Sequence, residues 1–383
     1  MAAPAGIGMS FGSHVPDSGV VPRRWFQAAR SATLADAMKL TWERLRLRTR
    51  HPFRIARPGA SVSGSELERV IVRLEHQGLA GFGEAVPVPY YKQTVASIQQ
   101  TLERAQPLLG DSPEPIEPIV DRLLHEFDDQ RATVAAIDAA LHDLVGKRRG
   151  QPVFELLGLD PAGTPPTSMT IGIDTAECVQ QKVAEAAEFG ILKIKVGTAD
   201  DHALLELIRQ AAPDKRIRVD ANCAWDVVQA EQRIPALAPY DLELVEQPLP
   251  PGRYDDLRRL RASLPPDSPP VIADEDCVRP ADVARLVGAV DGINIKLSKC
   301  GGLVEALRMI REARASGLAV MLGCMVETTL GIAAAAHLAS LVDYVDLDGH
   351  LLLAHDPFTG LELEGGTVRP GPGPGLGVSR RTD

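Results

Sequence analysis

Apolar and polar residues alternate along residues 39–83, and this two-residue period predicts β-strands. The stretch "ERVIVRLEHQGLAGFGEAV" reads as a hairpin that turns near residues 77–78. Apolar positions then recur at helical spacing in residues 94–106 and 117–149, and the second run ends at Gly150, a common residue type after a helix. Strands followed by helices predict an α+β domain for this part of the chain.

The pattern changes after a proline-rich segment at 161–166, which is the expected domain boundary. From there on, eight short aliphatic or β-branched runs alternate with helical patterns: "SMTIGI", "ILKIKVG", "RIRVDAN", "LELVEQP", "PVIADED", "GINIKLS", "LAVMLGC" and "DYVDLDG". Eight strands with intervening helices predict a parallel (β/α) barrel. The predicted fold class is therefore α/β, with an α+β domain in front of the barrel.

One polar or small residue stands near the end of each run. These residues are Thr170, Lys195, Asp220, Glu246, Asp274, Lys296, Cys324 and Asp346. The intervals between them are 25, 25, 26, 28, 22, 28 and 22 residues, and each is about what one strand, one helix and two short loops occupy. All eight should therefore reach the C-terminal rim of the barrel, where barrel enzymes keep their active sites.

Composition narrows the function classes. The 383 residues suggest two domains, or one barrel with an accessory domain, and 45% hydrophobic residues can form a sizeable core. A net charge of -10 without a Lys/Arg-rich block disfavours nucleic-acid binding, and no apolar run approaches the roughly 20 residues that span a bilayer. We therefore expect a soluble protein. The cysteines form no CxxC motif and indicate reduced thiols in a cytoplasmic protein: Cys178, Cys223, Cys277, Cys300 and Cys324.

Residues 1–36 are rich in Gly, Pro, Ser and Ala and carry a few arginines. They lack the apolar core of a secretory signal. A flexible leader or an upstream start codon, with Met38 as an internal start, is favoured over a transit peptide.

Three acids fall at successive predicted strand ends: Asp220 in "VDAN", Glu246 in "VEQP" and Asp274 in "IADED". Carboxylates that converge from adjacent strands would repel one another, but together they offer the hard oxygen ligands that Mg2+ prefers. A single acid at a strand end is usually solvated. Three in register predict a metal site.

The chain has only nine lysines, and several of them lie near these acids. Lys193 and Lys195 share a strand face because they are two residues apart. In "NIKLSK", Lys296 has the parity of Asn294 and fits the strand-end register, so Lys299 is interpreted as a loop residue. A lysine at a strand end can also simply extend its charged head into solvent.

Lys195 on the second barrel strand and Lys296 on the sixth should face each other across the barrel centre. A lysine near a divalent cation can have a lowered pKa, which suits a general base near neutral pH. Two such bases on opposite faces of a substrate permit removal of a proton α to a carboxylate on one side and its return on the other, with the metal stabilising the enediolate. This geometry fits a racemase, an epimerase or a β-eliminating lyase.

The stretch "DLDGH" places Asp346 and Asp348 two residues apart, so both should point to one face of a strand. Burying two like charges is costly unless a cation, a metal or a shared proton compensates them. A solvent-facing acidic turn is the alternative. Because the metal already has three carboxylates, we interpret the pair as counter-charges for an organic cation.

Several motifs resemble those of the enolase superfamily, specifically its muconate lactonizing enzyme subgroup: "KIKVG", "VDAN", "VEQP", "ADE", "NIKLSKCGG", "GCMVETTLGI", "GEAVPVP" and "GPGPGLGV". The resemblance covers about residues 40–378. It implies a modified (β/α)7β TIM-like barrel at 151–355, closed by an α+β capping domain formed by 37–150 and the C-terminal tail 356–383.

The resemblance also implies roles for the residues singled out above. The ligands of one Mg2+ per subunit correspond to Asp220, Glu246 and Asp274. Lys195 and Lys296 match the paired acid/base catalysts, and Lys193 matches a lysine that helps neutralise the substrate carboxylate.

Within the subgroup, "DLDG" is similar to the signature of dipeptide epimerases, in which two aspartates hold the α-ammonium group of the dipeptide. Asp346 and Asp348 take that role here, and Thr170 and Cys324 match other substrate contacts. The implied reaction is inversion at the C-terminal residue of a dipeptide, with L-Ala-D/L-Glu as the reference substrate.

The chain departs from that pattern in three places. In "PFRIARPGAS", the arginine that would pair with a glutamate side chain is not clearly present, although Arg54 or Arg57 could replace it. The loop "PVPYYKQT" places residues 90–92 near the mouth of the site, where they suit an apolar or acidic side chain. His350 stands where these enzymes often have proline. The departures bear on the second residue of the substrate.

Other activities need the same metal and lysines, namely those of N-succinylamino acid racemases, o-succinylbenzoate synthases and muconate cycloisomerases. They do not need two carboxylates for an ammonium group. A catalytically silent barrel would have no use for such costly buried charges. We expect an isomerase that acts on a small-molecule dipeptide, forms a homo-oligomer, and binds neither nucleic acid nor membrane.

Overall fold

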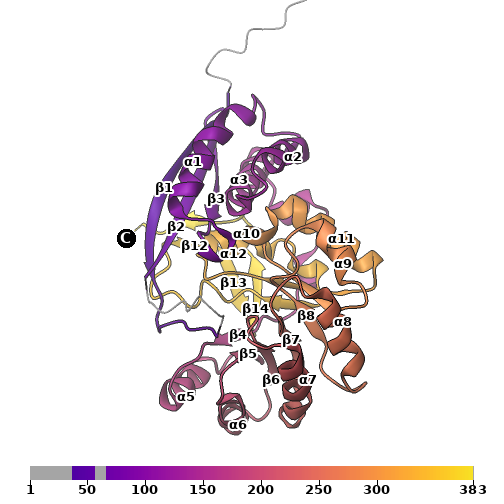
Figure 1. Ribbon diagram of the computed structural model, residues 1–383. Helices are drawn as coiled ribbons and strands as arrows, with labels where there is room; N and C mark the ends of the chain where they lie inside the picture. Colours follow the sequence, from indigo (N-terminus) through magenta and orange to yellow (C-terminus); the bar gives the residue numbers. More distant parts are fainter. Residues whose placement is uncertain (1–36, 57–65, 383) are drawn as a thin grey trace, which may run out of the picture.

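The computed structural model describes residues 37–56 and 66–382 (Figure 1). The predicted leader lies outside these described residues, and so does Arg57. An antiparallel sheet with helices beside it precedes an eight-stranded parallel barrel, and the chain ends in short strand pairs (Figure 1). No helix within the described ranges is long and apolar enough to cross a membrane.

The first sheet contains the hairpin that the sequence predicts. Its order is β1-β2-β3, with all neighbours antiparallel, and its strands are β1 Lys39–Arg48, β2 Glu66–His76 and β3 Leu79–Ala85. Gln77 (φ 50°) and Gly78 (φ 80°) form the turn, and two successive positive φ angles match the twist that hairpins favour. The turn fixes the register that pairs Val70 with Ala85.

Four helices follow this sheet: α1 Val95–Ala105, α2 Ile116–Glu126, α3 Arg131–Arg149 and α4 Val153–Leu156. The expectation of one helical run at 117–149 was wrong in one respect, because residues 127–130 separate α2 from α3. Gly150 ends α3 in the left-handed conformation (φ 68°), as predicted. The helix α3 lies directly on β3, since a Cβ atom at Gly83 would stand 2.0 Å from the carbonyl oxygen of Ala136.

The barrel prediction is confirmed. Eight parallel strands follow one another in the order β4 to β11, and the bridge between Thr167 and Val345 closes the ring. The strands are β4 Met169–Ile171, β5 Ile191–Lys195, β6 Arg216–Asp220, β7 Leu242–Glu246, β8 Val271–Ala273, β9 Gly292–Ile295, β10 Ala319–Gly323 and β11 Tyr344–Asp346.

Helices connect each barrel strand to the next, and none lies between β11 and the short strands of the tail, which gives the (β/α)7β arrangement within the described chain. The helices are α5 Ala176–Glu185, α6 Asp201–Ala211, α7 Val227–Ala236, α8 Tyr254–Ser263, α9 Pro280–Leu286, α10 Leu297–Cys300, α11 Leu303–Ala315 and α12 Thr329–Ala336. Single 3-10 turns are η1 Pro89–Tyr91, η2 Gln106–Leu108, η3 Pro161–Gly163, η4 Ala238–Tyr240 and η5 Ala339–Leu341.

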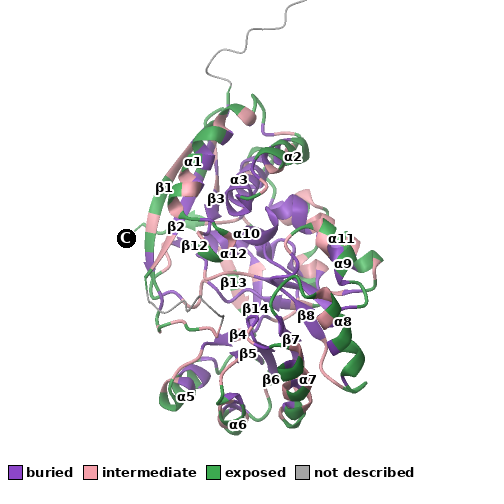
Figure 2. Cartoon of the chain, in the orientation of Figure 1, coloured by how far each residue is buried: buried purple, intermediate pink, exposed green. Residues whose placement is uncertain are grey.

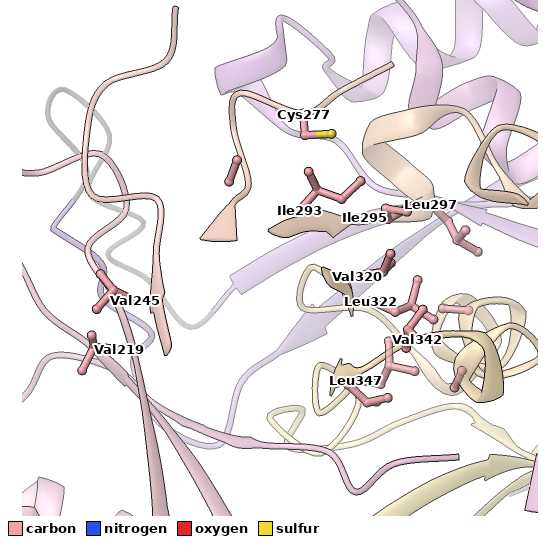
Figure 3. Packing of buried hydrophobic residues seen from close by; sticks show 14 of the residues in the cluster. Val219, Val245, Cys277, Ile293, Ile295, Leu297, Val320, Leu322, Val342 and Leu347 are labelled. Atoms are coloured by element: carbon pink, nitrogen blue, oxygen red, sulfur yellow. The ribbon is translucent and has the colours of Figure 1, made fainter. Parts of the chain in front are cut away.

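The largest apolar cluster fills the layer between the barrel strands and their helices (Figures 2 and 3). Side chains alternate along a strand, so Val219, next to Asp220, and Ile295, next to Lys296, point into this layer (Figure 3). The polar neighbours consequently face the inside of the barrel. A separate small cluster of Leu244, Ile272 and Met321 packs with Tyr344, as expected for the side-chain layers that fill a barrel.

The C-terminal tail forms two strand pairs, β12 Phe358–Thr359 with β15 Ser379–Arg380, and β13 Leu361–Glu364 with β14 Thr367–Pro370. It contacts the first sheet, where Arg380 forms a salt bridge with Glu43 of β1 at 2.5 Å. Gly375 lies against Asp143 of α3, where a Cβ atom would stand 2.1 Å from Oδ1. The first sheet, its helices and the tail therefore pack together.

Candidate active site

The eight positions predicted from spacing all lie at the C-terminal ends of barrel strands. Five are the last or middle residues of their strands, and Asp274, Lys296 and Cys324 directly follow β8, β9 and β10. The strands β5 and β9 stand four apart in the closed ring of eight. Lys195 and Lys296 therefore start from opposite walls of the barrel.

The three strands between them carry the acids. Asp220, Glu246 and Asp274 have 0%, 0% and 1% of their surface exposed. Burial would raise the pKa of Asp220, but Lys195 and Lys193 lower it to about 2. Burial also opposes ionisation of Asp274, yet Lys296 and Lys299 hold its pKa well below the ordinary value. Asp220 and Asp274 are thus buried charges that depend on lysine partners, whereas burial and the charge of Asp220 raise the pKa of Glu246.

Lys193 lies at the centre of this charge cluster. Its Nζ is 2.6 Å from Glu246 Oε2, 2.7 Å from Asp346 Oδ2 and 3.3 Å from Asp220 Oδ2. Burial would lower the pKa of Lys193, but the surrounding carboxylates, Asp346 first, raise it well above its ordinary value. Lys193 is therefore a fixed positive charge that links the acids of β6 and β7 to the end of β11.

The two proposed acid/base lysines each contact one carboxylate. Lys195 Nζ lies 2.6 Å from Asp220 Oδ2, and 6.0 Å from the ring centre of Phe53. Lys296 Nζ lies 2.7 Å from Asp274 Oδ2. Burial would lower the pKa of Lys296, but the carboxylates of Asp274 and Glu246 raise it. The lowered pKa expected for a lysine beside a bound divalent cation stays a prediction.

Lys299 is not the loop residue that parity predicted. The strand β9 ends at Ile295, and the one-turn helix α10 turns Lys299 back into the barrel, where only 1% of it is exposed. Its Nζ donates to Asp274 Oδ1 at 2.6 Å, to the Asn294 carbonyl at 2.8 Å and to the Asp274 carbonyl. The alternation rule fails here because the strand stops before this residue.

The acid pair of "DLDGH" is buried, with Asp346 4% and Asp348 3% exposed. Ser168 Oγ donates to Asp346 Oδ1 at 2.7 Å, and the Thr170 amide donates to Asp348 Oδ2 at 2.6 Å. Burial opposes ionisation of Asp346, but Lys193 lowers its pKa. Burial and the charge of Asp346 raise the pKa of Asp348 to about 7. The solvent-facing alternative is therefore excluded.

Cys324 begins the loop between β10 and α12, and this loop packs on the turn after β11. A Cβ atom at Gly349 would lie 2.1 Å from the Met325 carbonyl oxygen and 3.1 Å from Cys324 Sγ. Only glycine permits so close an approach, which explains the glycine of "DLDG". Burial, followed by Asp348, raises the pKa of the Cys324 thiol well above its ordinary value.

Several polar neighbours of these acids were not among the predicted site residues. Asn294 Nδ2 donates to Glu246 Oε1 at 2.8 Å, and the Asn222 amide donates to Asp220 Oδ1 at 2.9 Å. Gln247 Oε1 accepts from the Asp274 amide at 2.8 Å. Asn294 and Ser168 share strand parity with Lys296 and Thr170, so alternation could have identified both.

Three segments of the sequence depart from the dipeptide epimerase pattern, and they lie on different elements of the fold. The Arg54 carbonyl accepts from the Ile173 amide at 3.2 Å, which fixes this segment beside the end of β4. The rings of Tyr90 and Tyr91 meet edge to face at 5.0 Å. His350 follows the "DLDG" turn, and burial lowers the pKa of its imidazole to about 4.

The donor set suits a hard divalent cation, although no group of three or more His, Cys, Asp or Glu side chains in the described chain could hold a metal as it stands. Lysine ammonium groups contact the carboxylate oxygens instead. Lys193 Nζ lies between Glu246 Oε2 and Asp220 Oδ2, at 2.6 Å and 3.3 Å, so positive charge is already accommodated between two of the acids. Asp220, Glu246 and Asp274 would hold the ion by side-chain adjustment, since carboxylate oxygens are its preferred ligands.

Comparison with known proteins identifies two family matches. Residues 41–158 match the family described as mandelate racemase / muconate lactonizing enzyme, N-terminal domain. Residues 174–383 match the family described as enolase C-terminal domain-like. Together they span nearly all of the described residues.

Similar proteins extend over most of the chain. The L-Ala-D/L-Glu epimerase of Bacteroides thetaiotaomicron is 40% identical over 345 residues, which are 90% of this chain and 88% of that protein. A dipeptide epimerase structure from Enterococcus faecalis, complexed with Mg and L-Leu-L-Tyr, has a TM-score of 0.82 and 36% identity, and the match covers 90% and 99% of the two chains. An N-succinyl Arg/Lys racemase structure from Bacillus cereus has a TM-score of 0.83 and 28% identity, with 90% and 95% covered.

Proposed function

This chain belongs to the mandelate racemase / muconate lactonizing enzyme family of the enolase superfamily, and on that premise we propose that it is a Mg2+-dependent dipeptide epimerase, an isomerase. The observation that carries the proposal is the arrangement of buried charges at the barrel rim. Two lysines stand on opposite walls, three acids lie between them, and a second acid pair ends β11.

We propose that Lys195 and Lys296 exchange the α-proton of the C-terminal residue of the dipeptide. One neutral lysine removes the proton from one face, and the other ammonium group returns a proton to the opposite face. Since β5 and β9 are opposite strands of the barrel, the two Nζ atoms approach a substrate in the centre from two sides. This geometry inverts the α-carbon without moving the substrate.

Asp220, Glu246 and Asp274 are the proposed Mg2+ ligands. The ion, when bound, supplies positive charge that stabilises negative charge developing on the substrate carboxylate. The ligands are also the present partners of Lys195 and Lys296, so carboxylate oxygens engaged by the ion would no longer hold these lysines so strongly. Lys193 keeps a further positive charge beside the same carboxylate.

Asp346 and Asp348 are the proposed site for the α-ammonium group of the dipeptide. Ser168 holds Oδ1 of Asp346, and the Thr170 amide holds Oδ2 of Asp348. Oδ2 of Asp346 also accepts from Lys193 at 2.7 Å, so the ammonium would share that oxygen with Lys193 and use Oδ1 of Asp348. An added cation also favours ionisation of Asp348, whose pKa is raised to about 7. Thr170 and Cys324 border this end of the substrate.

The division of the chain, its compartment and its assembly are parts of the same proposal. Contacts of the tail with β1 and α3 support a capping unit formed by 37–150 and 356–383 on a barrel at 151–355. No disulfide joins any of the five cysteines, all of which lie in the described ranges, and this fits the reducing cytoplasm. The proposed homo-oligomer is testable by light scattering of the purified protein.

The test is a dipeptide library incubated in D2O with Mg2+. The enzyme should incorporate deuterium at the α-carbon of the C-terminal residue, detected by mass spectrometry and proton NMR. Series with L-Ala followed by acidic, apolar and basic residues would rank the second side chain. Turnover of N-succinylamino acids without exchange in any dipeptide would contradict the proposal and favour the racemase activity named for the Bacillus cereus relative.

Variants of the two lysines assign the faces within this experiment. Lys195→Gln and Lys296→Gln should each abolish epimerisation, and each should leave exchange in one enantiomer only, because one base remains. Lys215→Gln is the matched control. Lys215 directly precedes β6, at the end opposite Asp220, and its Nζ donates to backbone carbonyls such as that of Ala186 at 2.7 Å. Epimerisation by either lysine variant at the parent rate would disprove the two-base mechanism.

A further inference from the structure

Lys299 is a buried lysine that the proposed reaction does not use. Its side chain is 0% exposed, and within residues 37–56 and 66–382 its hydrogen bonds go to Asp274 and to the Asn294 carbonyl. An ammonium group has three hydrogens, and three acceptors take them. Lys299 therefore has no N–H group left to donate to a substrate. Its buried positive charge acts on its protein partners instead.

The two oxygens of Asp274 have different lysine partners. Lys299 Nζ lies 2.6 Å from Oδ1, and Lys296 Nζ lies 2.7 Å from Oδ2. Lys299 also binds the carbonyl of Asp274, so it grips the residue by its main chain and by one side of its carboxylate. The orientation of the carboxylate is thereby set, with Oδ2 turned toward Lys296.

The same ammonium group ties two strand ends together. It binds the carbonyl of Asn294 at 2.8 Å, and the Asn294 side chain donates to Glu246 Oε1 at 2.8 Å. Lys299 thus holds Asp274, which follows β8, against the end of β9. Asn294 of β9 in turn orients Glu246 of β7. Gln247 completes the arrangement by accepting from the Asp274 amide.

We propose that Lys299 is a positioning residue that holds Asp274 Oδ1, so that Oδ2 alone is left for Mg2+ and Lys296. Without Lys299, both oxygens of Asp274 are open to Lys296, which then stays bound to the carboxylate. The loss should weaken Mg2+ binding and slow proton transfer by Lys296 more than by Lys195. The effect on proton transfer rests on the proposed function. The effect on Mg2+ binding rests only on the cluster of acids.

The first experiment measures Mg2+ binding without substrate, by isothermal titration of the full chain and its variants. Lys299→Met removes the charge at similar length, and Lys299→Gln keeps a polar end. We expect both to weaken Mg2+ binding by about tenfold or more, the usual effect of losing a group that orients a metal ligand. Lys147→Met is the control, because Lys147 forms an equivalent bond to Asp143 at 2.6 Å outside the site. An affinity of both Lys299 variants within twofold of the parent overturns the proposal.

The second experiment follows α-deuterium exchange of the two dipeptide enantiomers separately, at saturating Mg2+. The enantiomer that depends on Lys296, identified with Lys296→Gln, should exchange at least about tenfold more slowly in Lys299→Met, and the other should change far less. Equal losses for both would overturn the selective effect on Lys296.

The outcomes separate this proposal from the proposed function. If the parent protein exchanges deuterium into no dipeptide, the proposed epimerase function is wrong. The Mg2+ titration still tests whether Lys299 positions Asp274 for Mg2+ binding. Circular dichroism and thermal unfolding check the fold of each variant. If neither Lys299 variant folds while Lys147→Met does, Lys299 is needed for folding itself, and the narrower positioning role is wrong.

Discussion

Asp348 is a buried carboxyl group that lowers the stability of the folded chain at neutral pH. Its pKa is raised from the ordinary 3.8 to about 7 by burial and by the charge of Asp346. Between these pH values the unfolded chain has released the proton that the folded chain keeps. Folding stability contributed by this residue therefore falls as the pH rises from about 4 to about 7, and remains low above that. A cation bound beside Asp348 would relieve the cost.

Asp348→Asn should bind a dipeptide less tightly and yet be more stable than the parent at pH 8. Asparagine can still accept from the Thr170 amide, but it carries no charge for an ammonium group. We expect binding to weaken by about 10-fold to 100-fold, the value of one charge-assisted hydrogen bond. Calorimetric titration measures this loss, and urea unfolding measures the gain in stability, which should shrink toward pH 5. Unchanged dipeptide affinity would show that the ammonium binds elsewhere.

Single residues were predictable where strand periodicity determines their direction. Spacing and alternation placed Lys195, Asp220 and Glu246 at strand ends facing inward, because both rules are properties of the local chain. Lys299 was not predictable in this way, since a one-turn helix replaces the strand before it. The bond between Lys193 and Asp346 joins residues 153 positions apart, and no local pattern reports such a pairing.

At the scale of elements, helix α12 is anchored across the two parts of the fold. Glu84 of β3 accepts from the Thr328 amide at 3.2 Å and the Gly331 amide at 3.3 Å, so a carboxylate from the first sheet caps the N-terminus of a barrel helix. Arg69 of β2 lies 3.5 Å from Glu84 and binds the Val326 carbonyl at 3.0 Å. These contacts fix the loop that carries Cys324.

Glu84→Gln should destabilise the protein by about 3 kcal/mol, because it leaves Arg69 buried without this countercharge. Arg69 and Glu84 have side chains only 5% and 0% exposed. Urea unfolding at pH 7 measures the change. Glu68→Gln is the control, since Glu68 pairs with Arg44 at the surface and should cost under about 1 kcal/mol. Equal small losses in both variants would show that the contact between the sheet and α12 contributes little.

Elements were predictable as far as hydrophobic periodicity is local. The hairpin of β2 and β3 and the eight barrel strands follow directly from it. The break between α2 and α3 was not foreseen, because apolar spacing resumes on both sides of residues 127–130. Short tail strands such as β12 also escaped, since each is defined by its partner and is only two residues long.

At the scale of the whole molecule, the barrel brings together charges that the chain keeps far apart. Burying acids and lysines in one place is costly, and each charge depends on its partners. Asp220, Glu246 and Asp274 come from the ends of three neighbouring strands, and closure of the barrel brings Asp346 of β11 to Lys193 of β5. The capping arrangement of the first sheet was predicted from the family resemblance and not from local patterns. Its contacts with the tail join residues as distant in the sequence as Glu43 and Arg380.

Mg2+ should therefore stabilise the folded state, because the unfolded chain has no such cluster. At a concentration 100 times the dissociation constant, the gain is about 2.7 kcal/mol, which for a chain of this size raises Tm by about 2 °C or more. Thermal unfolding with Mg2+, and again after a chelator at matched ionic strength, measures the shift. Asp220→Asn should unfold at the same temperature in both conditions, since one of three acid ligands is gone, whereas Lys147→Met should keep the full shift. If Mg2+ raised the Tm of Asp220→Asn as much as that of the parent, the stabilising ion would bind away from the barrel rim. The charges of Asp220, Glu246 and Asp274 would then be compensated by the lysines alone.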